Sequence, residues 1–292
     1  MPLQKLPNLD KVLVDQFILN SLNEDVGDGD HTSLATIPKG TEGKAKLLVK
    51  DEGILAGIEL AEEIFRIVDA NLKLKIFIND GAKVKYGDVA FEVEGDTQSI
   101  LKAERLVLNC MQRMSGIATK THQIADILKD THTKVLDTRK TTPGLRYLEK
   151  WAVRIGGGVN HRFGLYDMIL IKDNHVDYSG GIKQAIENAN QYIKSQNKKL
   201  EIEIEVRNLD ELEQVLQVGD VNRILLDNFN LHDLRKAVSI IGGKYITEAS
   251  GGITIDNIRG YADCGVDYIS MGALTHSVKS LDLSLKAVGV GY

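Results

Sequence analysis

The chain has 292 residues, of which 43% are hydrophobic, and its formal net charge is −5 at pH 7. This composition allows one large core or two smaller ones and excludes a disordered, collagen-like or fibrous protein. With no apolar run of about 18 residues and no apolar signal core at the N-terminus, neither membrane insertion nor secretion is indicated, and we expect a cytoplasmic protein.

The first part of the chain mixes helical and strand patterns. Apolar spacing predicts helices over residues 9–25 and 58–70, and short alternating runs predict strands over 44–50, 73–78 and 89–95. We therefore expect an α+β domain over residues 1–117 with a small sandwich-like or barrel-like sheet. A helical pattern over residues 99–114 follows, with a break expected near Ser115-Gly116.

The second part alternates short β-branched runs with helical stretches. Six runs, KVLDT, DMILIK, EIEIEV, RILLD, YITEAS and VDYISMG, read as strands. Such alternation predicts parallel βα units, and the lack of a GxGxxG turn after the first strand disfavours a doubly wound sheet. We expect an α/β fold with an open βα barrel over residues 118–276. Residues 277–292, which include an edge-like alternating run, are expected to join the N-terminal domain.

The two cysteines, Cys110 and Cys264, lie in apolar or helical patterns without CxxC or Cys/His spacing. They are interpreted as buried free thiols, and no structural zinc is implied.

Cations gather in residues 137–175. This segment holds seven Lys and Arg against four Asp and Glu, so seven minus four gives +3 within a chain of net charge −5. A nucleic-acid binder needs a broad basic face, so a local basic pocket in an acidic chain indicates a small anionic ligand instead.

Unusual residues also end each of the six expected strands. Active-site residues of βα barrels lie at the carboxyl ends of the strands. The residues at these ends are Thr138, Arg139 and Lys140; Lys172; Glu205; Asp227; Ser250, Gly251 and Gly252; and Met271, Gly272 and Ala273. The two late glycine turns are typical of phosphate sites, although tight turns and helix caps use glycine as well.

Several of these residues have more than one interpretation. Arg146, Lys150 and Arg154, spaced by four on an expected helix, are interpreted as a solvated face, with Glu149 available for local pairing. His161 beside Arg162 is either a ligand donor or a structural hydrogen-bonding group. Glu205 and Asp227 suit ribose hydroxyls or Mg²⁺, or else pair with lysines. Glu201 and Glu203 alternate with Glu205, and at most one of these three needs a catalytic role.

These residues coincide with a family pattern. The runs DTRKTTPGLR, GGGVNHRFGL, DMILIKDNH, LLDNF, EASGGI and ISMGALTHS, with EDVGDGDHTS and AERLVLNCMQRMSGIAT earlier in the chain, closely resemble the quinolinate phosphoribosyltransferases. The resemblance implies an N-terminal α/β sandwich with an open α/β barrel. It also implies transfer of phosphoribose from phosphoribosyl pyrophosphate to quinolinate with loss of CO₂, giving nicotinate mononucleotide and pyrophosphate in de novo NAD biosynthesis, with Mg²⁺.

The resemblance further implies roles for individual residues. Thr138, Arg139, His161, Arg162 and Lys172 match the dicarboxylate pocket, and Lys140 matches a pyrophosphate contact. Glu205 and Asp227 match the ribose and Mg²⁺ site and, with Lys172, the catalytic residues. The residues Ser250, Gly251, Gly252, Met271, Gly272 and Ala273 match the frame of the 5′-phosphate. Arg105 matches an arginine lent by a second subunit of a homodimer or higher homo-oligomer, although a solvated helix arginine fits the residues equally well.

Three other functions remain open on sequence alone. A related pyrophosphorylase acting on another acid, as in molybdenum-transport-associated relatives, is disfavoured by the set Arg139, His161, Arg162 and Lys172. A noncatalytic phosphosugar sensor leaves Lys172, Glu205 and Asp227 without a purpose. A carrier module is suggested by the run DGAKVKYGD, but no matching hairpin with a lysine at its tip follows.

Overall fold

The computed structural model describes residues 11–288, and contacts divide the chain into two compact units. The first unit comprises residues 1–122, 142–157 and 277–292, and the second comprises residues 123–141 and 158–276. The domains expected from sequence, residues 1–117 with 277–292 and residues 118–276, stay a prediction. The two compact units have different limits: the first boundary falls inside one long helix, after residue 122, and residues 142–157 group with the first unit.

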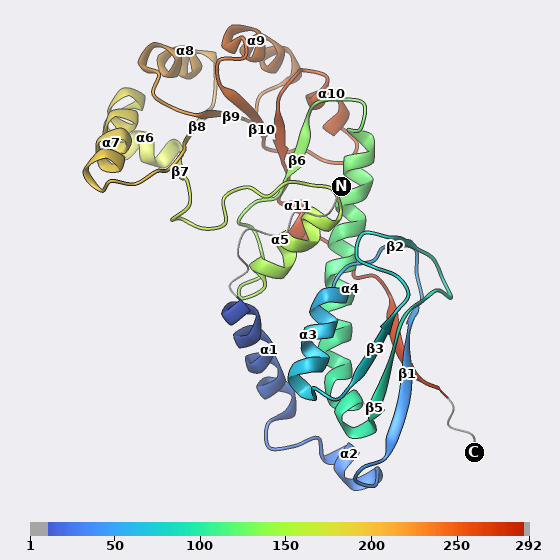
Figure 1. Cartoon of the computed structure of the whole chain (residues 1–292). Helices are drawn as coiled ribbons and strands as arrows, with labels where there is room; N and C mark the ends of the chain where they lie inside the picture. The colour runs from blue at the N-terminus through green and yellow to red at the C-terminus, as the bar shows by residue number, and fades with distance from the viewer. Residues whose placement is uncertain (1–10, 289–292) are drawn as a thin grey trace. The chain divides into compact units, whose positions relative to one another are not determined.

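The first unit is built around a four-stranded antiparallel sheet of order β12-β1-β5-β3 (Figure 1). Its strands are β1 (Glu42–Val49), β3 (Lys73–Ile76), β5 (Val89–Asp96) and β12 (Leu283–Ala287), and β2 (Gly53–Ile54) pairs separately with β4 (Lys83–Val84). Its helices are α1 (Lys11–Val26), α2 (His31–Thr36), α3 (Ile58–Val68), α4 (Thr97–Ile127), whose last turn belongs to the second unit, and α5 (Arg146–Ile155).

The carboxyl-terminal strand β12 pairs antiparallel with β1 and forms an edge of this sheet. Inward-facing residues of β1 and β5, including Leu47, Phe91 and Val93, are fully buried. Phe91 contacts Phe65 of α3 edge-to-face, with ring centroids 5.9 Å apart. The apolar stripe of α3 thus packs on the sheet and closes the core of the unit.

The expected break of helix α4 near Ser115-Gly116 is wrong, because the helix continues to Ile127. Both residues are small because neighbouring backbone approaches the helix here. Ser115 Oγ accepts the N–H of Ala56 at 2.9 Å and donates to its carbonyl at 3.1 Å. A Cβ at Gly116 would collide with the carbonyl of Lys279. The small residues therefore reflect tertiary packing rather than a helix end.

The second unit contains a six-stranded parallel sheet of order β6-β11-β10-β9-β8-β7 (Figure 1). Its strands are β6 (Lys134–Leu136), β7 (Ile169–Ile171), β8 (Ile202–Val206), β9 (Arg223–Asp227), β10 (Ile246–Ser250) and β11 (Tyr268–Ser270). Its helices are α6 (Asp173–Ser179), α7 (Ile182–Ser195), α8 (Leu209–Val218), α9 (Leu231–Ile241), α10 (Ile258–Ala262) and α11 (Ala273–His276). All six predicted strands are present, and the α/β fold class is confirmed.

Helices between the strands cover the sheet with amphipathic faces. Leu212 and Val215 of α8 and Leu234 and Ala237 of α9 are fully buried, while their polar neighbours are exposed. Asn208 and Asn230 cap these two helices by accepting the N–H groups of the third helical residue. This βα alternation brings the carboxyl ends of all six strands to one edge of the sheet.

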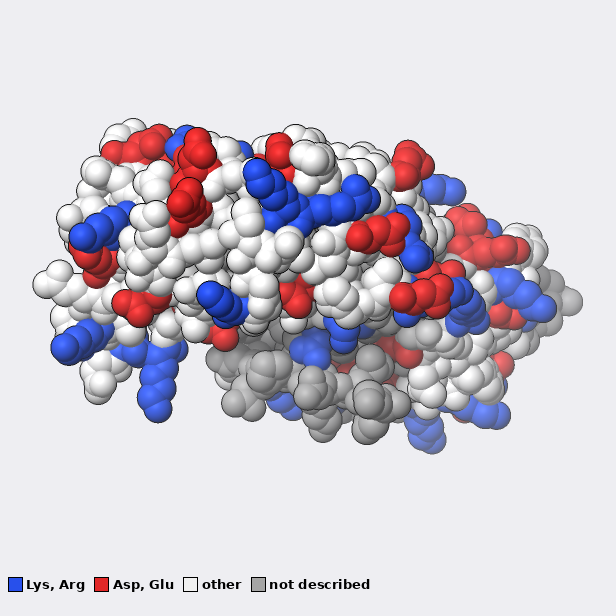
Figure 2. Space-filling view, turned by 90° about the horizontal axis from the view of Figure 1, so that it is seen from above, with Lys and Arg blue, Asp and Glu red and all other residues white. Residues whose placement is uncertain are grey.

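Within the described residues, no helix is both long and apolar enough to span a membrane. Acidic and basic side chains are interspersed over the face shown in Figure 2, where no broad area carries a single charge sign.

Candidate active site

The predicted site residues of the second unit lie at the carboxyl edge of its parallel sheet. Thr138, Arg139 and Lys140 follow β6, and Lys172 directly follows β7. Glu205 lies in β8 and Asp227 ends β9. Because parallel strands end at the same edge, the fold brings these residues from distant parts of the sequence to one side of the unit.

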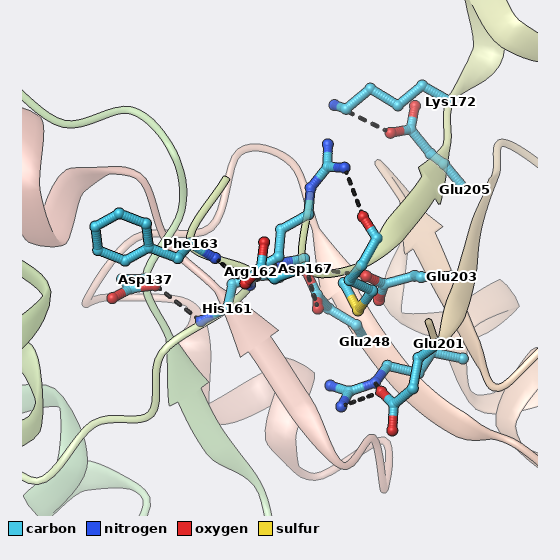
Figure 3. A network of polar contacts seen from close by, with 12 residues as sticks. Asp137, His161, Arg162, Phe163, Asp167, Lys172, Glu201, Glu203, Glu205 and Glu248 are labelled. Carbon is cyan, nitrogen blue, oxygen red and sulfur yellow. Dashed lines mark hydrogen bonds and ion pairs between the residues drawn. The ribbon is translucent and has the colours of Figure 1, made fainter. Parts of the chain in front are cut away.

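His161 is enclosed by carboxylates in a nearly buried cluster (Figure 3). Its Nε2 lies 3.0 Å from Glu203 Oε2 and 3.3 Å from Glu248 Oε2. Its Nδ1 accepts the N–H of Arg162 at 2.7 Å. The structure therefore gives both ring nitrogens partners within the protein, and the ligand role expected of His161 stays a prediction that these contacts do not support.

Burial and mutual repulsion shift the pKa values of this cluster. Burial raises the pKa of Glu203, and the neighbouring charge of Glu248 raises it further. Burial opposes the charged form of His161, but its contacts with Glu203 and Glu248 outweigh this and raise the His161 pKa. A raised pKa of His161 by itself favours an imidazolium with an N–H on both nitrogens, but Nδ1 accepts the N–H of Arg162. Because the pKa of Glu203 is raised as well, the carboxyl side of this coupled cluster can hold the extra proton, and we assign the ring a single N–H, at Nε2.

Asp137 binds the turn at residues 160–162, which carries His161. This fully buried carboxylate follows β6 and accepts the backbone N–H of His161 at 2.9 Å. Its second oxygen accepts the side-chain amide of Asn160. The backbone of the turn is thus fixed by a carboxylate, whose hydrogen bonds to N–H groups are stronger than those of a neutral acceptor.

The guanidinium group of Arg162 is held by a hydrogen bond at one of its nitrogens. Its Nη1 donates to the carbonyl of Met168 at 3.1 Å. Burial lowers the pKa of Arg162, and the nearby charge of Arg139 lowers it further, although the group stays cationic. Two arginines close enough to repel each other form a site suited to an anion with more than one negative charge.

A second cluster, formed by two carboxylates and one lysine, lies at the ends of β7, β8 and β9. Lys172 Nζ is 3.5 Å from Glu205 Oε2. Burial raises the pKa of Glu205 and of Asp227, and the charge of Asp227 raises that of Glu205 further. The two carboxylates are therefore incompletely neutralised by Lys172, and hard oxygen ligands of this kind fit Mg²⁺.

The first of the two late glycine turns has a backbone conformation that would be strained for other residues. Gly251 and Gly252 have φ angles of +92° and +63°, and a Cβ at Gly251 would collide with Asn228. No acceptor within residues 11–288 takes the N–H groups of Gly251 or Gly252. These N–H groups are available to a phosphate, as predicted for the frame that also includes Ser250.

The other turn lies against Lys140. A Cβ at Gly272 would lie 2.9 Å from Lys140 Cδ, and Thr275 Oγ1 donates to the Lys140 carbonyl at 2.8 Å. Met271, whose side chain is buried, donates its N–H to the carbonyl of Leu136. Glycine at 272 therefore permits the lysine stem to approach the turn that continues into Ala273.

Arg105 lies outside this unit, on the exposed face of α4 in the first unit. It lines a cavity of about 680 Å³ formed by α1, α4 and residues 143–149. Arg113 in the same cavity contacts the buried carboxylate of Glu149 through Nε at 2.8 Å and Nη2 at 2.6 Å.

The interpretation of α5 as a solvated basic face with local pairing is wrong for two residues. Lys150 is buried rather than solvated. Glu149 pairs with Arg113 of α4, not with a cation of its own helix, and also accepts the N–H of Thr142. The helix is packed on both faces because residues 142–157 are part of the core of the first unit.

Sequence reasoning missed the buried carboxylates Asp137, Glu203 and Glu248. Glu201, Glu203 and Glu205 alternate with Ile in EIEIEV, and only one of them was expected to need a catalytic role. A parallel sheet covered on both sides, however, buries both faces of its strands, so Glu203 is buried as well. The usable signal was the presence of charged residues inside a buried-strand pattern, where an unpaired charge is costly.

The fold and the site together are typical of a βα-barrel enzyme whose strand ends carry cations suited to a multiply charged anion and phosphate-type glycine turns. Family models match both parts of the chain: the quinolinate phosphoribosyl transferase N-terminal domain over residues 30–115 and the C-terminal domain over residues 117–286. The chain belongs to the quinolinate phosphoribosyltransferase family.

Similar proteins cover nearly the whole chain. A probable nicotinate-nucleotide pyrophosphorylase [carboxylating] of Bacillus subtilis is 42% identical over 275 residues, which cover 94% of this chain and 92% of the relative. Quinolinate phosphoribosyltransferase [decarboxylating] 1b of Nicotiana tabacum is 47% identical over 281 residues, covering 91% of this chain and 80% of the relative. The solved structure of the nicotinate-nucleotide pyrophosphorylase from Francisella tularensis is 40% identical and superimposes with a TM-score of 0.89 over 98% of this chain and 99% of that one.

Proposed function

We propose that this chain transfers phosphoribose from phosphoribosyl pyrophosphate to the ring nitrogen of quinolinate and releases pyrophosphate and CO₂, giving nicotinate mononucleotide for NAD biosynthesis. The observation that carries the proposal is the strand-end cation set of Arg139, Arg162 and Lys172 in a member of this family. Quinolinate has two adjacent carboxylates, which suit forked guanidinium groups.

The residue roles follow from the chemistry of each group. Thr138, Arg139, Arg162 and Lys172 bind the two carboxylates and turn the ring nitrogen toward the anomeric carbon of the sugar. Lys140 contacts the pyrophosphate. The backbone N–H groups of the turns at Ser250, Gly251, Gly252, Met271, Gly272 and Ala273 hold the 5′-phosphate.

Glu205 and Asp227 are the residues that would hold Mg²⁺, because their carboxylates carry negative charge that Lys172 neutralises only in part. The ion, which reaches the site with the pyrophosphate group, would stabilise negative charge on that leaving group. Lys172 sits at the junction of this acidic pair and the dicarboxylate pocket.

The chemistry requires two bond changes in sequence. The ring nitrogen forms a bond to the anomeric carbon as the bond from that carbon to pyrophosphate breaks, through an oxocarbenium-like state. The nitrogen is then a pyridinium, which takes up the electron pair when the bond from C2 to its carboxylate breaks, and C2 gains a proton. The protein binds and orients both substrates, and no covalent enzyme intermediate is needed.

The direct test mixes purified protein with quinolinate, phosphoribosyl pyrophosphate and Mg²⁺, with nicotinate replacing quinolinate in a parallel reaction. Mass spectrometry should find nicotinate mononucleotide only in the quinolinate reaction. Product from nicotinate alone would assign another acceptor, and no product from folded protein that binds the phosphosugar would favour a sensor.

Arg105 completes the pocket of a second subunit in a homodimer or larger homo-oligomer. This is supported by its exposed position on α4, outside the unit that holds the other site residues. Arg105→Ala and Lys172→Ala variants should each be inactive alone. After random exchange of subunits, half of the dimers are mixed and hold one intact site each, so about a quarter of wild-type activity should return. No recovery despite demonstrated exchange would leave Arg105 outside the partner's site.

A further inference from the structure

Three buried carboxylates, Asp137, Glu203 and Glu248, lie around the His161 turn of the second unit and are called the acidic layer below (Figure 3). Glu203 and Glu248 lie in β8 and β10, Asp137 directly follows β6, and the exposed fractions of the three residues are 0%, 1% and 0%. Alternate strands of a βα barrel supply the side chains of one interior layer, which is normally apolar. Carboxylates in such a layer are costly unless hydrogen bonds or charges compensate them.

The compensating group is His161, the one side chain that reaches both glutamates in the described residues. Its Nε2 lies 3.0 Å and 3.3 Å from their nearest oxygens. No other donor within residues 11–288 reaches the carboxylate oxygens of Glu203 or Glu248.

Ring chemistry decides between a metal and a proton at this point. One His nitrogen and two carboxylates within 4.8 Å of one another also match a metal-ligand set. A neutral imidazole has a single N–H, and a histidine that ligates a metal donates this N–H from its other nitrogen. Here Nδ1 accepts the N–H of Arg162, so the ring proton is assigned to Nε2, the nitrogen that lies 3.0 Å and 3.3 Å from the glutamate oxygens. A nitrogen that carries a proton cannot ligate a metal.

We propose that Glu203 and Glu248 are positioning residues for the dicarboxylate pocket, which hold His161 as the Nε2–H tautomer so that Nδ1 fixes the backbone of Arg162. The proposal rests on the proposed function, because Arg162 acts on the carboxylates of quinolinate. His161 then serves the pocket through its neighbour Arg162.

The turn is thereby held at consecutive backbone N–H groups. Asp137 accepts the N–H of His161, and the His161 ring accepts the N–H of Arg162. The guanidinium of Arg162 starts from a fixed backbone and is steadied by the Met168 carbonyl. Without the glutamates, the ring can rotate or change tautomer, and the second of these backbone bonds is lost.

The first measurement needs no variant and no substrate. In wild-type protein with ¹⁵N-labelled histidine, NMR at pH 7 should show His161 with unprotonated Nδ1 and protonated Nε2, assigned by comparison with His161→Gln. A proton on Nδ1 would overturn the proposal. So would a stoichiometric metal ion that elemental analysis finds in the wild-type protein and not in His161→Gln, because an ion held by Glu205 and Asp227 would be present in both.

The second measurement separates the two substrates. Glu203→Met and Glu248→Met keep the side-chain length but remove the acceptor, and should raise the KM for quinolinate about 10-fold or more while the KM for phosphoribosyl pyrophosphate stays within about 3-fold. Glu203→Gln and Glu248→Gln keep an acceptor oxygen for Nε2–H and should stay within about 3-fold for both substrates. Glu201→Gln is the matched control, because Glu201 directly precedes the same strand but is exposed and pairs with Arg223.

The outcomes distinguish positioning from general damage. Equal increases in both KM values for the Met variants, or loss of quinolinate affinity in the Gln variants, would show that the glutamates only support the core. If the Met variants do not fold, the wild-type tautomer and the Gln variants still decide. A wild-type protein with the expected tautomer but without turnover of quinolinate would refute the proposed function and leave the His161 geometry intact.

Discussion

Replacing Arg162 by Lys tests the dicarboxylate pocket most directly, because the substitution keeps the charge and removes the forked geometry. In the structure, Nη1 of Arg162 donates to the Met168 carbonyl at 3.1 Å, which leaves the other guanidinium N–H groups for a ligand. A lysine ammonium offers a point charge on a flexible stem and cannot pair with a carboxylate in the same bidentate way.

The expected size of the effect follows from the bonds that are lost. The bond to the Met168 carbonyl is made in the free enzyme and in the complex, so its loss largely cancels in kcat/KM. A bidentate pair with a substrate carboxylate contributes about 1.5–3 kcal/mol, which corresponds to a fall of about 10- to 10²-fold in kcat/KM for quinolinate.

The assay is initial-rate kinetics with quinolinate varied at saturating phosphoribosyl pyrophosphate and Mg²⁺, then the reverse. The loss should appear with quinolinate, and the KM for phosphoribosyl pyrophosphate should change less than about 3-fold, since Arg162 does not serve the phosphosugar in this assignment. Arg207→Lys is a matched control on the same unit, because Arg207 is exposed and pairs with Glu211. A KM for quinolinate within about 3-fold of wild type would refute the assignment of Arg162.

Three further predictions concern the phosphate turn, the acidic pair and helix α4. Gly251→Ala places a Cβ on a residue with a φ of +92°, a conformation that is strained for alanine. The substitution should raise the KM for phosphoribosyl pyrophosphate about 10-fold or more, with little change in the KM for quinolinate. Equal effects on both KM values would indicate general damage. The pKa values of Glu205 and Asp227 are raised, so their carboxylates take up protons at higher pH than usual. The Mg²⁺ concentration for half-maximal activity should therefore rise as the pH falls toward 5. A Mg²⁺ requirement that stays constant from pH 8 to 5 would exclude these residues as ligands. Ser115→Ala leaves the buried N–H and carbonyl of Ala56 without partners and should lower the free energy of unfolding by about 1–3 kcal/mol in urea titrations followed by circular dichroism, whereas an unchanged midpoint would contradict the role given to this hydroxyl.

Strand positions in the second unit were predictable from sequence because parallel strands covered on both faces are short, β-branched and apolar. RILLD and YITEAS match β9 and β10 closely. The positions of Arg139, Lys140 and Lys172 at strand ends followed from the same pattern, because the fold class fixes where carboxyl ends meet.

What sequence could not predict depends on partners that are distant in the chain. Ser115-Gly116 was predicted to break the helix because helix propensity depends on local sequence alone. The small residues are required by contacts with Ala56 and residue 279, which are distant in the chain. Glu149 lies beside cations in sequence, yet its partner is Arg113, 36 residues earlier. Local pairing rules describe isolated helices, whereas a buried carboxylate takes the partner that the tertiary fold places against it.

The acidic layer also explains how a pocket made to bind a dianion can exist before the dianion arrives. Arg139 and Arg162 are close enough to lower the pKa of Arg162, because the positive charges of their guanidinium groups repel each other. Glu203 acts on Arg162 in the opposite direction, and Asp137 lies two residues before Arg139 on the same chain segment. The charge of Glu203 therefore offsets part of the repulsion between the two guanidinium groups before substrate binds. Asp137 accepts the N–H of His161 and Glu203 lies against the His161 ring, so these carboxylates can stabilise the empty site while the guanidinium N–H groups remain for quinolinate.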